Sequence, residues 1–366
     1  MKRKLNILVC PLNWGLGHAS RDIPIISEFV KREHNVIIAG SENPIEIIRT
    51  EFPNLKFVKF SGFNISYPNN GSFVFYFLLR IRVLLWRIFK EHIQLKKIII
   101  EQKIDVVISD NRYGLWNKNV YSIFITHQIN IKIPIKCKLL EHIVNSINHY
   151  FINKYDLCWV PDFEKPPFLA GELSHKKNKL KNIAYTGLLS KFLNYPAPKN
   201  NNEKKFEIVA IISGPEPHRT FFENILTVQF QTIKKSCLIV NGTPLKITKT
   251  NVIGNVEIVS HLSTNDLYNV INNSKYIVSR AGYTTIMDLI ALKRTAILVP
   301  TPGQTEQEYL ADYYSEKKMF LKMIQKKFDI NEALKNINKY SPIIYNENCN
   351  LLNKEIDKIE KQLIYT

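Results

Sequence analysis

The sequence predicts an α/β protein with two doubly wound parallel sheets, one in each half of the chain. Its 366 residues exceed the size of one small domain and suggest two, at roughly 100–200 residues each. Short apolar runs alternate with helical patterns, as in parallel sheets that are covered by helices on both faces. The alternation starts again after Tyr195–Lys205, a polar, proline-bearing stretch that we interpret as a linker. We therefore expect an N-terminal domain over residues 1–195 and a C-terminal domain over residues 206–346.

Each half contains five short apolar runs with the length and composition of buried strands. In the first half they are Leu5–Cys10, Val36–Ala39, Phe57–Phe60, Asp105–Ser109 and Ser122–Thr126. In the second half they are Ile208–Ile212, Cys237–Val240, Val256–Val259, Tyr276–Ser279 and Ala296–Val299. Residues 347–366 predict a final amphipathic helix, for which a return to the N-terminal domain is one placement. Ligands of doubly wound sheets bind beyond the carboxyl ends of the strands, so we expect the functional site where the two halves face each other.

The chain carries a net charge of +18, and most of the excess belongs to its first half. Residues 1–202 hold 29 Lys and Arg against 15 Asp and Glu, whereas residues 203–366 hold 21 against 17. Such a surplus indicates an anionic partner, although a composition rich in Ile, Lys and Asn explains part of it. No nucleic-acid-binding motif accompanies the charge, so we expect no nucleic-acid partner.

The remaining composition narrows the class of protein. A hydrophobic fraction of 45% and a charged fraction of 22% exclude a mainly disordered or fibrous chain. The five cysteines are scattered without a Cys-x-x-Cys pair, which disfavours a zinc site or disulfide framework and predicts a reducing, cytoplasmic location. The N-terminal segment Met1–Lys4 is basic, and the apolar run that follows it is too short for a signal peptide. We interpret this run as the first strand.

Residues 73–100 mix apolar and aromatic side chains with basic ones. Arg80, Arg82 and Arg87 interrupt the apolar stretch, which makes it a poor membrane-spanning helix. One interpretation is a helix that lies in the surface of an anionic membrane, with the protein bound peripherally at the cytoplasmic face. The other is a buried helix whose arginines extend to the protein surface.

The first candidate motif, Trp14-Gly15-Leu16-Gly17-His18-Ala19-Ser20-Arg21, follows the first apolar run. Glycines allow the backbone to approach an anion, and a helix N-terminus offers unpaired N–H groups. The spacing is similar to a dinucleotide-binding fingerprint, but the loop is longer than the tight turn of such sites. We predict His18 at the mouth of the site, with Gly15, Gly17 and Arg21 beside it. The alternative for His18 is a capping or space-filling role.

The second candidate is Asp110, which ends the apolar run Asp105–Ser109. In a doubly wound sheet this end opens on the same edge as His18. A carboxylate beside an imidazole fixes its tautomer and stabilises the imidazolium, which makes a better general base. The alternative is an aspartate that caps the following segment. Arg112 and His127, which follow neighbouring strand ends, are further candidates for the same side of the site.

The third motif is the most specific. Ser279–Asp288 (SRAGYTTIMD) leaves one predicted strand and enters a helix, and Pro302–Tyr309 (PGQTEQEY) follows the next strand. These segments resemble the donor-binding region of GT-B glycosyltransferases that use nucleotide sugars. The resemblance extends over both halves. It is strongest to the bacterial peptidoglycan N-acetylglucosaminyltransferases, which act on a lipid-linked acceptor, and it includes the UDP-glycosyltransferases. It implies a GT-B fold, in which two Rossmann-like domains face each other across a cleft.

Carried over by position, the resemblance implies a donor site in the second half. The turn and helix start at Ser279, Arg280, Ala281, Gly282, Thr284 and Thr285 would face the donor's phosphates. Asp288 would bind the ribose hydroxyls, where the family usually has Glu. The sugar hydroxyls would contact Gln304, Thr305, Glu306 and Gln307. His261 and Leu262 would lie near the base. Ser213, Gly214 and Arg219 occupy the phosphate loop, which departs from the family in having one glycine, and Arg219 would supply charge to the diphosphate.

The resemblance also implies that His18 is the catalytic base and Asp110 its supporting aspartate. We therefore expect inverting transfer of a hexosyl group to an unknown acceptor from a nucleotide sugar, with UDP as the expected nucleotide. The basic first half favours an anionic or lipid-linked acceptor at the cell envelope. The sequence lacks Asp-x-Asp, so we expect no metal and no cofactor. The alternatives are a nucleotide-sugar 2-epimerase of the same fold, an NAD-dependent oxidoreductase and a non-catalytic nucleotide-sugar-binding protein.

Overall fold

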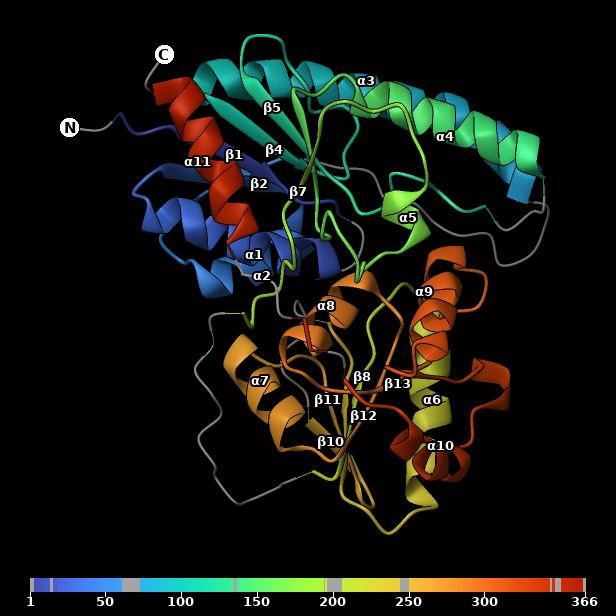
Figure 1. Cartoon of the computed structure of the whole chain (residues 1–366). Helices are drawn as coiled ribbons and strands as arrows, with labels where there is room; N and C mark the ends of the chain where they lie inside the picture. The colour runs from blue at the N-terminus through green and yellow to red at the C-terminus, as the bar shows by residue number, and fades with distance from the viewer. Residues whose placement is uncertain are drawn as a thin grey trace. The chain divides into compact units, whose positions relative to one another are not determined.

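The computed structural model describes residues 3–13, 16–60, 73–133, 137–193, 195, 206–243, 250–342, 344–345 and 350–364. The chain divides into two compact units. Unit 1 comprises residues 1–14, 18–189 and 347–366, and unit 2 comprises residues 15–17 and 190–346. Each unit contains one mainly parallel, helix-covered sheet, which confirms the predicted fold class (Figure 1). Apart from Tyr195, the predicted linker lies outside the described residues.

Unit 1 contains a seven-stranded sheet in the order β3-β2-β1-β4-β5-β6-β7, in which every neighbouring pair is parallel. The strands are β1 (Asn6–Cys10), β2 (Asn35–Gly40), β3 (Lys56–Lys59), β4 (Val106–Asp110), β5 (Tyr121–Ile125), β6 (Leu157–Val160) and β7 (Ile183–Tyr185). The first five correspond to the predicted strands. The last two were not predicted, although β6 is as long as several runs that were. Strand order reverses between β1 and β4, and such a switch point is where doubly wound sheets bind ligands.

The helices of unit 1 are α1 (Leu16–Lys31), α2 (Glu42–Glu51), α3 (Phe73–Gln102), α4 (Lys138–Ile152), α5 (Glu172–His175) and α11 (Leu351–Ile364). On α1, Ile23, Ile26 and Phe29 are buried at the helical spacing that the sequence predicted, whereas Val30 is exposed. Leu95 and Ile98 of α3 pack in the same core cluster as Leu8 and Cys10 of β1.

The C-terminal helix α11 belongs to unit 1 (Figure 1). Arg32 Nη1 at the end of α1 donates to Asp357 Oδ1 at 2.5 Å, and His34 Nε2 lies 2.6 Å from Glu360 Oε1. His34 Nδ1 also accepts a hydrogen bond from the backbone of Leu5 at 3.1 Å. Through Arg32 and His34, these contacts join α11 to the end of α1 and to the start of β1.

Unit 2 contains a second seven-stranded sheet, in the order β10-β11-β9-β8-β12-β13-β14. Its strands are β8 (Ile208–Ile211), β9 (Cys237–Val240), β10 (Thr250–Ile253), β11 (Val256–Val259), β12 (Tyr276–Ser279), β13 (Ile297–Leu298) and β14 (Leu321–Lys322). All neighbours are parallel except the edge strand β10, which pairs antiparallel with β11. The edge strands β10 and β14 were not predicted, because β10 is mostly exposed and β14 has only two residues.

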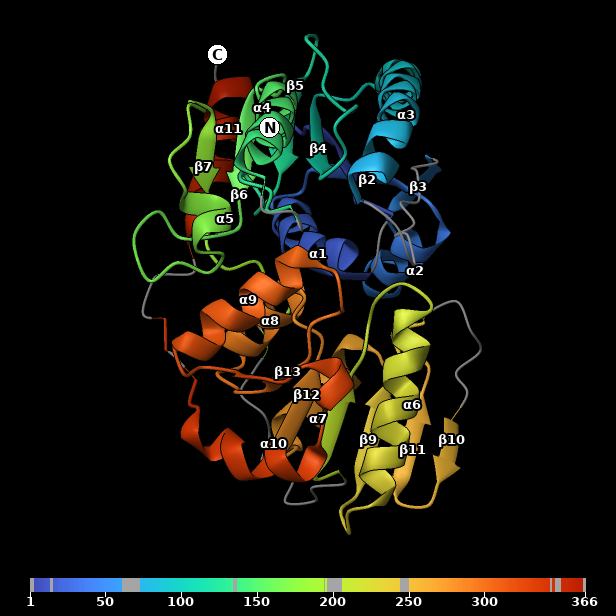
Figure 2. The same cartoon turned by 90° about the vertical axis from the view of Figure 1, so that its right-hand side faces the viewer.

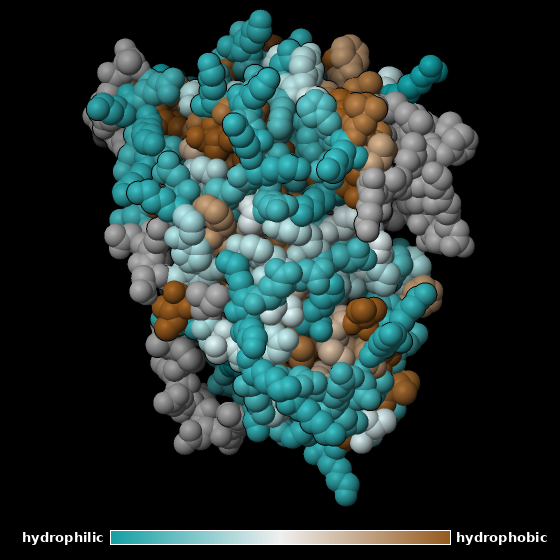
Figure 3. Space-filling model, turned by 45° about the vertical axis from the view of Figure 1, so that its right-hand side comes forward, coloured by the Kyte–Doolittle hydropathy of each residue, from teal (hydrophilic) through white to brown (hydrophobic). Residues whose placement is uncertain are grey.

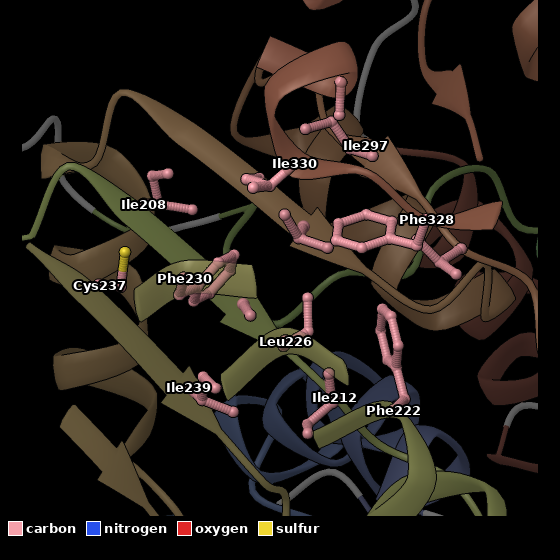
Figure 4. Close-up of a cluster of buried hydrophobic side chains, with 14 of the residues drawn as sticks. Ile208, Ile212, Phe222, Leu226, Phe230, Cys237, Ile239, Ile297, Phe328 and Ile330 are labelled. Atoms are coloured by element: carbon pink, nitrogen blue, oxygen red, sulfur yellow. The ribbon is translucent and has the colours of Figure 1, made fainter. Parts of the chain in front are cut away.

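The helices of unit 2 are α6 (His218–Gln231), α7 (Thr264–Asn273), α8 (Tyr283–Ala291), α9 (Thr305–Glu316) and α10 (Ile330–Asn336), with 3-10 turns at Gln325–Lys327 and Ile337–Lys339 (Figure 2). On α6, Phe222, Leu226 and Phe230 are fully buried at a spacing of four residues. This spacing forms one apolar stripe, which packs with sheet residues such as Ile208 and Ile239 (Figure 4). The sheet and α6 thus form a rigid base for the loops at the strand ends.

Candidate active site

Unit 1 brings together three polar side chains from the carboxyl ends of its central strands. His18 lies in the first turns of α1, which follows β1; Asp110 is the last residue of β4; and His127 follows β5. Since β1, β4 and β5 are neighbours in the sheet, these positions share one edge at the switch point. Arg21, one helical turn after His18, joins them from α1.

Short polar contacts join the four side chains of this cluster. His18 Nδ1 lies 3.0 Å from Asp110 Oδ2. Arg21 donates from Nε to Asp110 Oδ2 at 2.9 Å and from Nη2 to Asp110 Oδ1. Arg21 Nη1 lies 3.2 Å from His127 Nδ1. Because an ionised carboxylate only accepts hydrogen bonds, we assign the Nδ1 proton to His18, which leaves the lone pair on Nε2.

Asp110 is fully buried and its charge is compensated. Burial by itself raises the pKa of this carboxyl, but the charges of Arg21 and His18 outweigh it, so the net shift is downward. Asp110 therefore stays ionised at neutral pH and can stabilise an imidazolium at His18. The side chain of His18 is 17% exposed and thus reachable from solvent. The prediction that Asp110 and His18 lie together agrees with this geometry, as does the placement of Arg21 and His127.

Arg112 is placed differently from the prediction. Its side chain is fully buried, donates to Glu91 Oε1 of α3 at 2.9 and 3.1 Å, and stacks on the ring of Phe60. A buried guanidinium requires an anion, and Glu91 provides it. Within the described residues no contact joins Arg112 to His18, so Arg112 has a packing role in unit 1. Of the predicted glycines, Gly17 lies in the first turn of α1, and Gly15 lies outside the described residues.

Unit 2 presents buried polar atoms at the carboxyl ends of its strands. Asn241 follows β9, Ser260 follows β11, Ser279 ends β12 and Thr301 follows β13. In the described part of the chain, no hydrogen-bond partner is found for Asn241 Oδ1, Ser260 Oγ, Ser279 Oγ or Thr301 Oγ1. Unpaired buried polar groups are costly, so four of them at one sheet edge indicate a ligand that completes them. Only Ser279 was predicted, because single Ser, Thr and Asn residues after strands carry little sequence signal.

The two arginines predicted to face the diphosphate are engaged within unit 2. Arg280 is buried and donates to the carbonyl oxygens of Val299 and His218 and to Gln325 Oε1, at 2.7–3.2 Å. Its guanidinium also lies 4.2 Å from the centre of the Phe222 ring. Burial lowers the pKa of Arg280 to about 9. Arg219 pairs with Glu216 three residues earlier. These contacts hold the two side chains against the loops of unit 2.

The other predicted donor residues lie at the same strand ends. Gly282 caps the N-terminus of α8, and Thr284 and Thr285 fall in its first turn, after Ala281. Ser213 and Gly214 lie between β8 and α6, where Gly214 has a φ of 139° that favours glycine. Gln307 Oε1 accepts from the backbone of Thr301 at 2.9 Å, and its Nε2 donates to Gln304 Oε1 at 2.5 Å. Thr305 and Glu306 open α9, and His261 and Leu262 follow β11.

Asp288 of α8, which the sequence resemblance assigns to the donor's ribose, is a buried carboxylate. Ser190 Oγ donates to its Oδ1 at 2.6 Å. Burial raises the pKa of Asp288 to about 6, although the charge of Lys191 and the Ser190 hydrogen bond oppose the shift. Burial and the same lysine lower the pKa of His261. The carboxylate of Asp288 therefore changes its charge near neutral pH.

We predict that nucleotide affinity depends on this ionisation. Ribose hydroxyls donate to an ionised carboxylate more strongly than to a protonated one, so UDP affinity should rise about tenfold as pH increases through the pKa of about 6. Calorimetric titration of UDP on either side of this pH measures the change. Asp288→Asn should bind UDP weakly at every pH. A wild-type affinity that does not change with pH, or equals that of the variant, would remove Asp288 from the donor site.

No set of three His, Cys, Asp or Glu side chains that could hold a metal ion occurs within the described ranges. Nor does this part of the chain include a helix that is long and apolar enough to span a membrane.

The comparisons with known proteins agree with this architecture. Residues 209–363 match the model of the glycosyltransferase family 28 C-terminal domain. The chain resembles the structure of a kitacinnamycin glycosyltransferase, with a TM-score of 0.63, 15% identity, and 99% of this chain and 100% of the other covered. It also resembles MurG from Acinetobacter baumannii, with a TM-score of 0.52, 11% identity, and 98% and 95% covered. No curated protein sequence matches the chain.

The fold also occurs outside glycosyl transfer. A putative UDP-N-acetylglucosamine 2-epimerase from Listeria monocytogenes matches with a TM-score of 0.61 and 11% identity, over 100% of this chain and 98% of that one. Identities this low indicate fold and not activity, and the family match concerns unit 2 and α11. The chain therefore has the GT-B fold, and its residues 209–363 are similar to the glycosyltransferase family 28 C-terminal domain.

Proposed function

We propose that the protein transfers a sugar from a nucleotide-sugar donor to a hydroxyl group of an acceptor, with inversion. The observation that carries this proposal is the pairing of His18 Nδ1 with the buried Asp110, which leaves Nε2 as a base. The similarity of residues 209–363 to the family 28 domain supports the donor half of the proposal. Unit 1 then binds the acceptor and unit 2 the donor.

The proposed reaction balances with groups that the chain supplies. His18 Nε2 takes the proton as the acceptor O–H bond breaks, and the freed oxygen forms a bond to the anomeric carbon. The bond from that carbon to the diphosphate breaks, and the nucleoside diphosphate leaves with the electron pair. Asp110 stabilises the imidazolium through Nδ1, and Arg21 keeps Asp110 ionised. Attack from the face opposite the leaving group inverts the anomeric centre.

The donor is proposed to be a UDP-sugar held at the strand ends of unit 2. Asp288 would accept hydrogen bonds from the ribose, and the hydroxyls of Ser260, Ser279 and Thr301 would gain partners. Backbone N–H groups at the starts of α6 and α8 would stabilise the leaving diphosphate. We expect this reaction to proceed without a metal ion.

Product analysis tests the proposal against epimerisation. The protein is incubated with each of a panel of nucleotide sugars, first alone and then with lipid-linked or soluble acceptors. A glycosyltransferase releases nucleoside diphosphate and forms a glycoside only when an acceptor is present, and a chelator leaves the rate unchanged. Conversion of the donor to a second nucleotide sugar without an acceptor would instead identify a 2-epimerase.

We also propose that the outward face of α3 binds an anionic membrane at its cytoplasmic surface. Trp86, Phe89 and Ile93 are about half exposed or more, and Lys90 Nζ lies 3.7 Å from the centre of the Trp86 ring. Glu91 is the one acidic residue within residues 82–100, and it is buried against Arg112. This face is thus apolar and cationic, which suits an interfacial helix. Hydrophobic residues stand among hydrophilic ones on the face of the molecule that Figure 3 shows.

Co-sedimentation with vesicles measures this binding. We predict that replacing Trp86 and Phe89 with serine weakens binding to anionic vesicles about tenfold or more, because each ring loses its burial in the lipid interface. Replacing Phe221 and Val228, which are similarly exposed on α6 of unit 2, serves as the matched control. Absence of wild-type binding at low salt would contradict the proposal, as would equal loss in the control.

A further inference from the structure

Asp22 is a second buried carboxyl group in the His18 cluster. It lies one residue after Arg21 and four residues after His18, so the side chains of His18 and Asp22 lie on the same side of α1. Its exposure is 0%, and within the described structure neither carboxyl oxygen has a hydrogen-bond partner. The proposed transfer reaction assigns it no role.

Among the described residues around Asp22, no cationic side chain is left to pair with its carboxylate. Arg21 is the nearby cation, but its guanidinium makes two hydrogen bonds to Asp110. Asp110 adds a negative charge on the β4 side, and the Cys10 thiol on β1 is neutral, because burial raises its pKa to about 12. His127 contacts Arg21, and Arg112 is paired with Glu91. An ionised Asp22 would therefore be a second buried anion without a counterion, which is strongly unfavourable.

We propose that Asp22 is held as a neutral carboxylic acid and acts as a positioning residue that leaves Asp110 as the single anion for Arg21 and His18. Two carboxyl groups beside one arginine are then distinguished by their hydrogen bonds. Asp110, with three donors, is ionised, and Asp22, with none, keeps its proton. When Asp22 loses its proton at higher pH, it competes with Asp110 for Arg21 and weakens the ion pair that holds Asp110 against His18. Ionisation of Asp22 thus sets the upper pH limit at which Asp110 still orients His18 as a base. This inference rests on the proposed function.

The first test is independent of activity. Burial, followed by the charge of Asp110, raises the pKa of Asp22 well above its usual value, while Arg21 opposes the shift. When the pKa of a carboxyl group is higher in the folded state, the folded protein binds more protons than the unfolded chain. The free energy of unfolding then falls as pH rises from the carboxyl pKa of the unfolded chain to that of the folded protein. Asp22→Asn removes this loss. The folding equilibrium constant of the variant should therefore exceed that of the wild type by about tenfold or more at neutral pH, and the gain should vanish in acid.

Denaturant unfolding of wild type, Asp22→Asn and Asp22→Leu across pH measures this difference, with the exposed Asp357→Asn as control. Infrared spectra of the wild-type protein with labelled aspartate should show a protonated carboxyl band at neutral pH, which the Asp22 variants lack. Absence of that band would overturn the proposal even if the variants failed to fold. A pH-independent stability difference for a folded variant would overturn it as well.

The second test concerns the reaction. The fraction of its own neutral-pH transfer rate that Asp22→Asn keeps at alkaline pH should exceed the fraction that the wild type keeps. Identical pH profiles of kcat/KM would contradict the positioning role. If neither protein transfers sugar, the proposed function fails, while the unfolding and infrared results still decide whether Asp22 is protonated.

Discussion

Replacing His18 with alanine is expected to lower the rate of glycosyl transfer about 10²–10⁴-fold, the usual contribution of a general base. The physical reason is that His18 is the most exposed imidazole of the described cluster, with a side chain that is 17% exposed, whereas His127 is buried. Asp110 is fully buried, and Arg21 only donates hydrogen bonds. The affinity for UDP should remain at the wild-type value, because the nucleotide is assigned to unit 2. Steady-state transfer and calorimetric UDP titration separate the two effects.

The control for this variant is His142→Ala. His142 lies on the exposed side of α4 and belongs to no cluster at the strand ends. Its replacement should leave both transfer and UDP affinity unchanged. Transfer by His18→Ala at the wild-type rate would exclude His18 as the base.

Replacing Asp110 with asparagine is expected to damage both stability and activity. Arg21, which is 2% exposed, would lose its bidentate anion, and breaking such a buried pair costs about 3–5 kcal/mol. An asparagine N–H that faces His18 would also require Nδ1 to accept, which moves the imidazole proton to Nε2 and removes the base. Transfer should therefore fall about 10²–10⁴-fold even in the folded fraction.

A double variant separates these two losses. Arg21→Met combined with Asp110→Asn removes both partners of the ion pair, so it should be more stable than Asp110→Asn alone, yet remain inactive. Asp22 could ionise to pair with Arg21 in the single variant, so adding Asp22→Asn should destabilise Asp110→Asn further. Thermal or denaturant unfolding measures each step. Wild-type activity in Asp110→Asn would contradict the assigned tautomer of His18.

Much of the architecture was predictable because strong local patterns encode it. Buried parallel strands such as Leu5–Cys10 are continuous apolar runs, and their order in the chain with helices between them limits the topology. The edge strands β10 and β14 were missed because β10 is mostly exposed and β14 has only two residues. His18 and Asp110 were predictable as partners because His18 follows a buried strand, Asp110 ends another, and parallel strands end at one sheet edge.

The roles of the charged residues depended on three-dimensional contacts. Nothing in the local sequence distinguishes Arg21, which binds Asp110, from Arg112, which is neutralised by Glu91, a residue 21 positions away. Likewise, Arg280 follows a strand end as a phosphate ligand would, but its guanidinium is satisfied by backbone carbonyls and Gln325. Pairing of a buried charge is decided by whichever opposite charge folding brings near, which a local pattern does not contain.

For the net charge of +18, too, the sequence gives the distribution along the chain and the structure gives the contacts. The sequence by itself determined that the excess lies in the first half, and that residues 73–100 mix apolar and basic side chains. Tertiary structure decided that Glu91 is buried with Arg112, so that the outward side chains of α3 over residues 82–100 include cations and no acid. It also decided that Asp22 lies buried beside an ionised Asp110, with no hydrogen-bond partner among the described residues. Sequence records which charges exist, but burial and distance determine which of them interact, because Coulomb energy and desolvation depend on position in space.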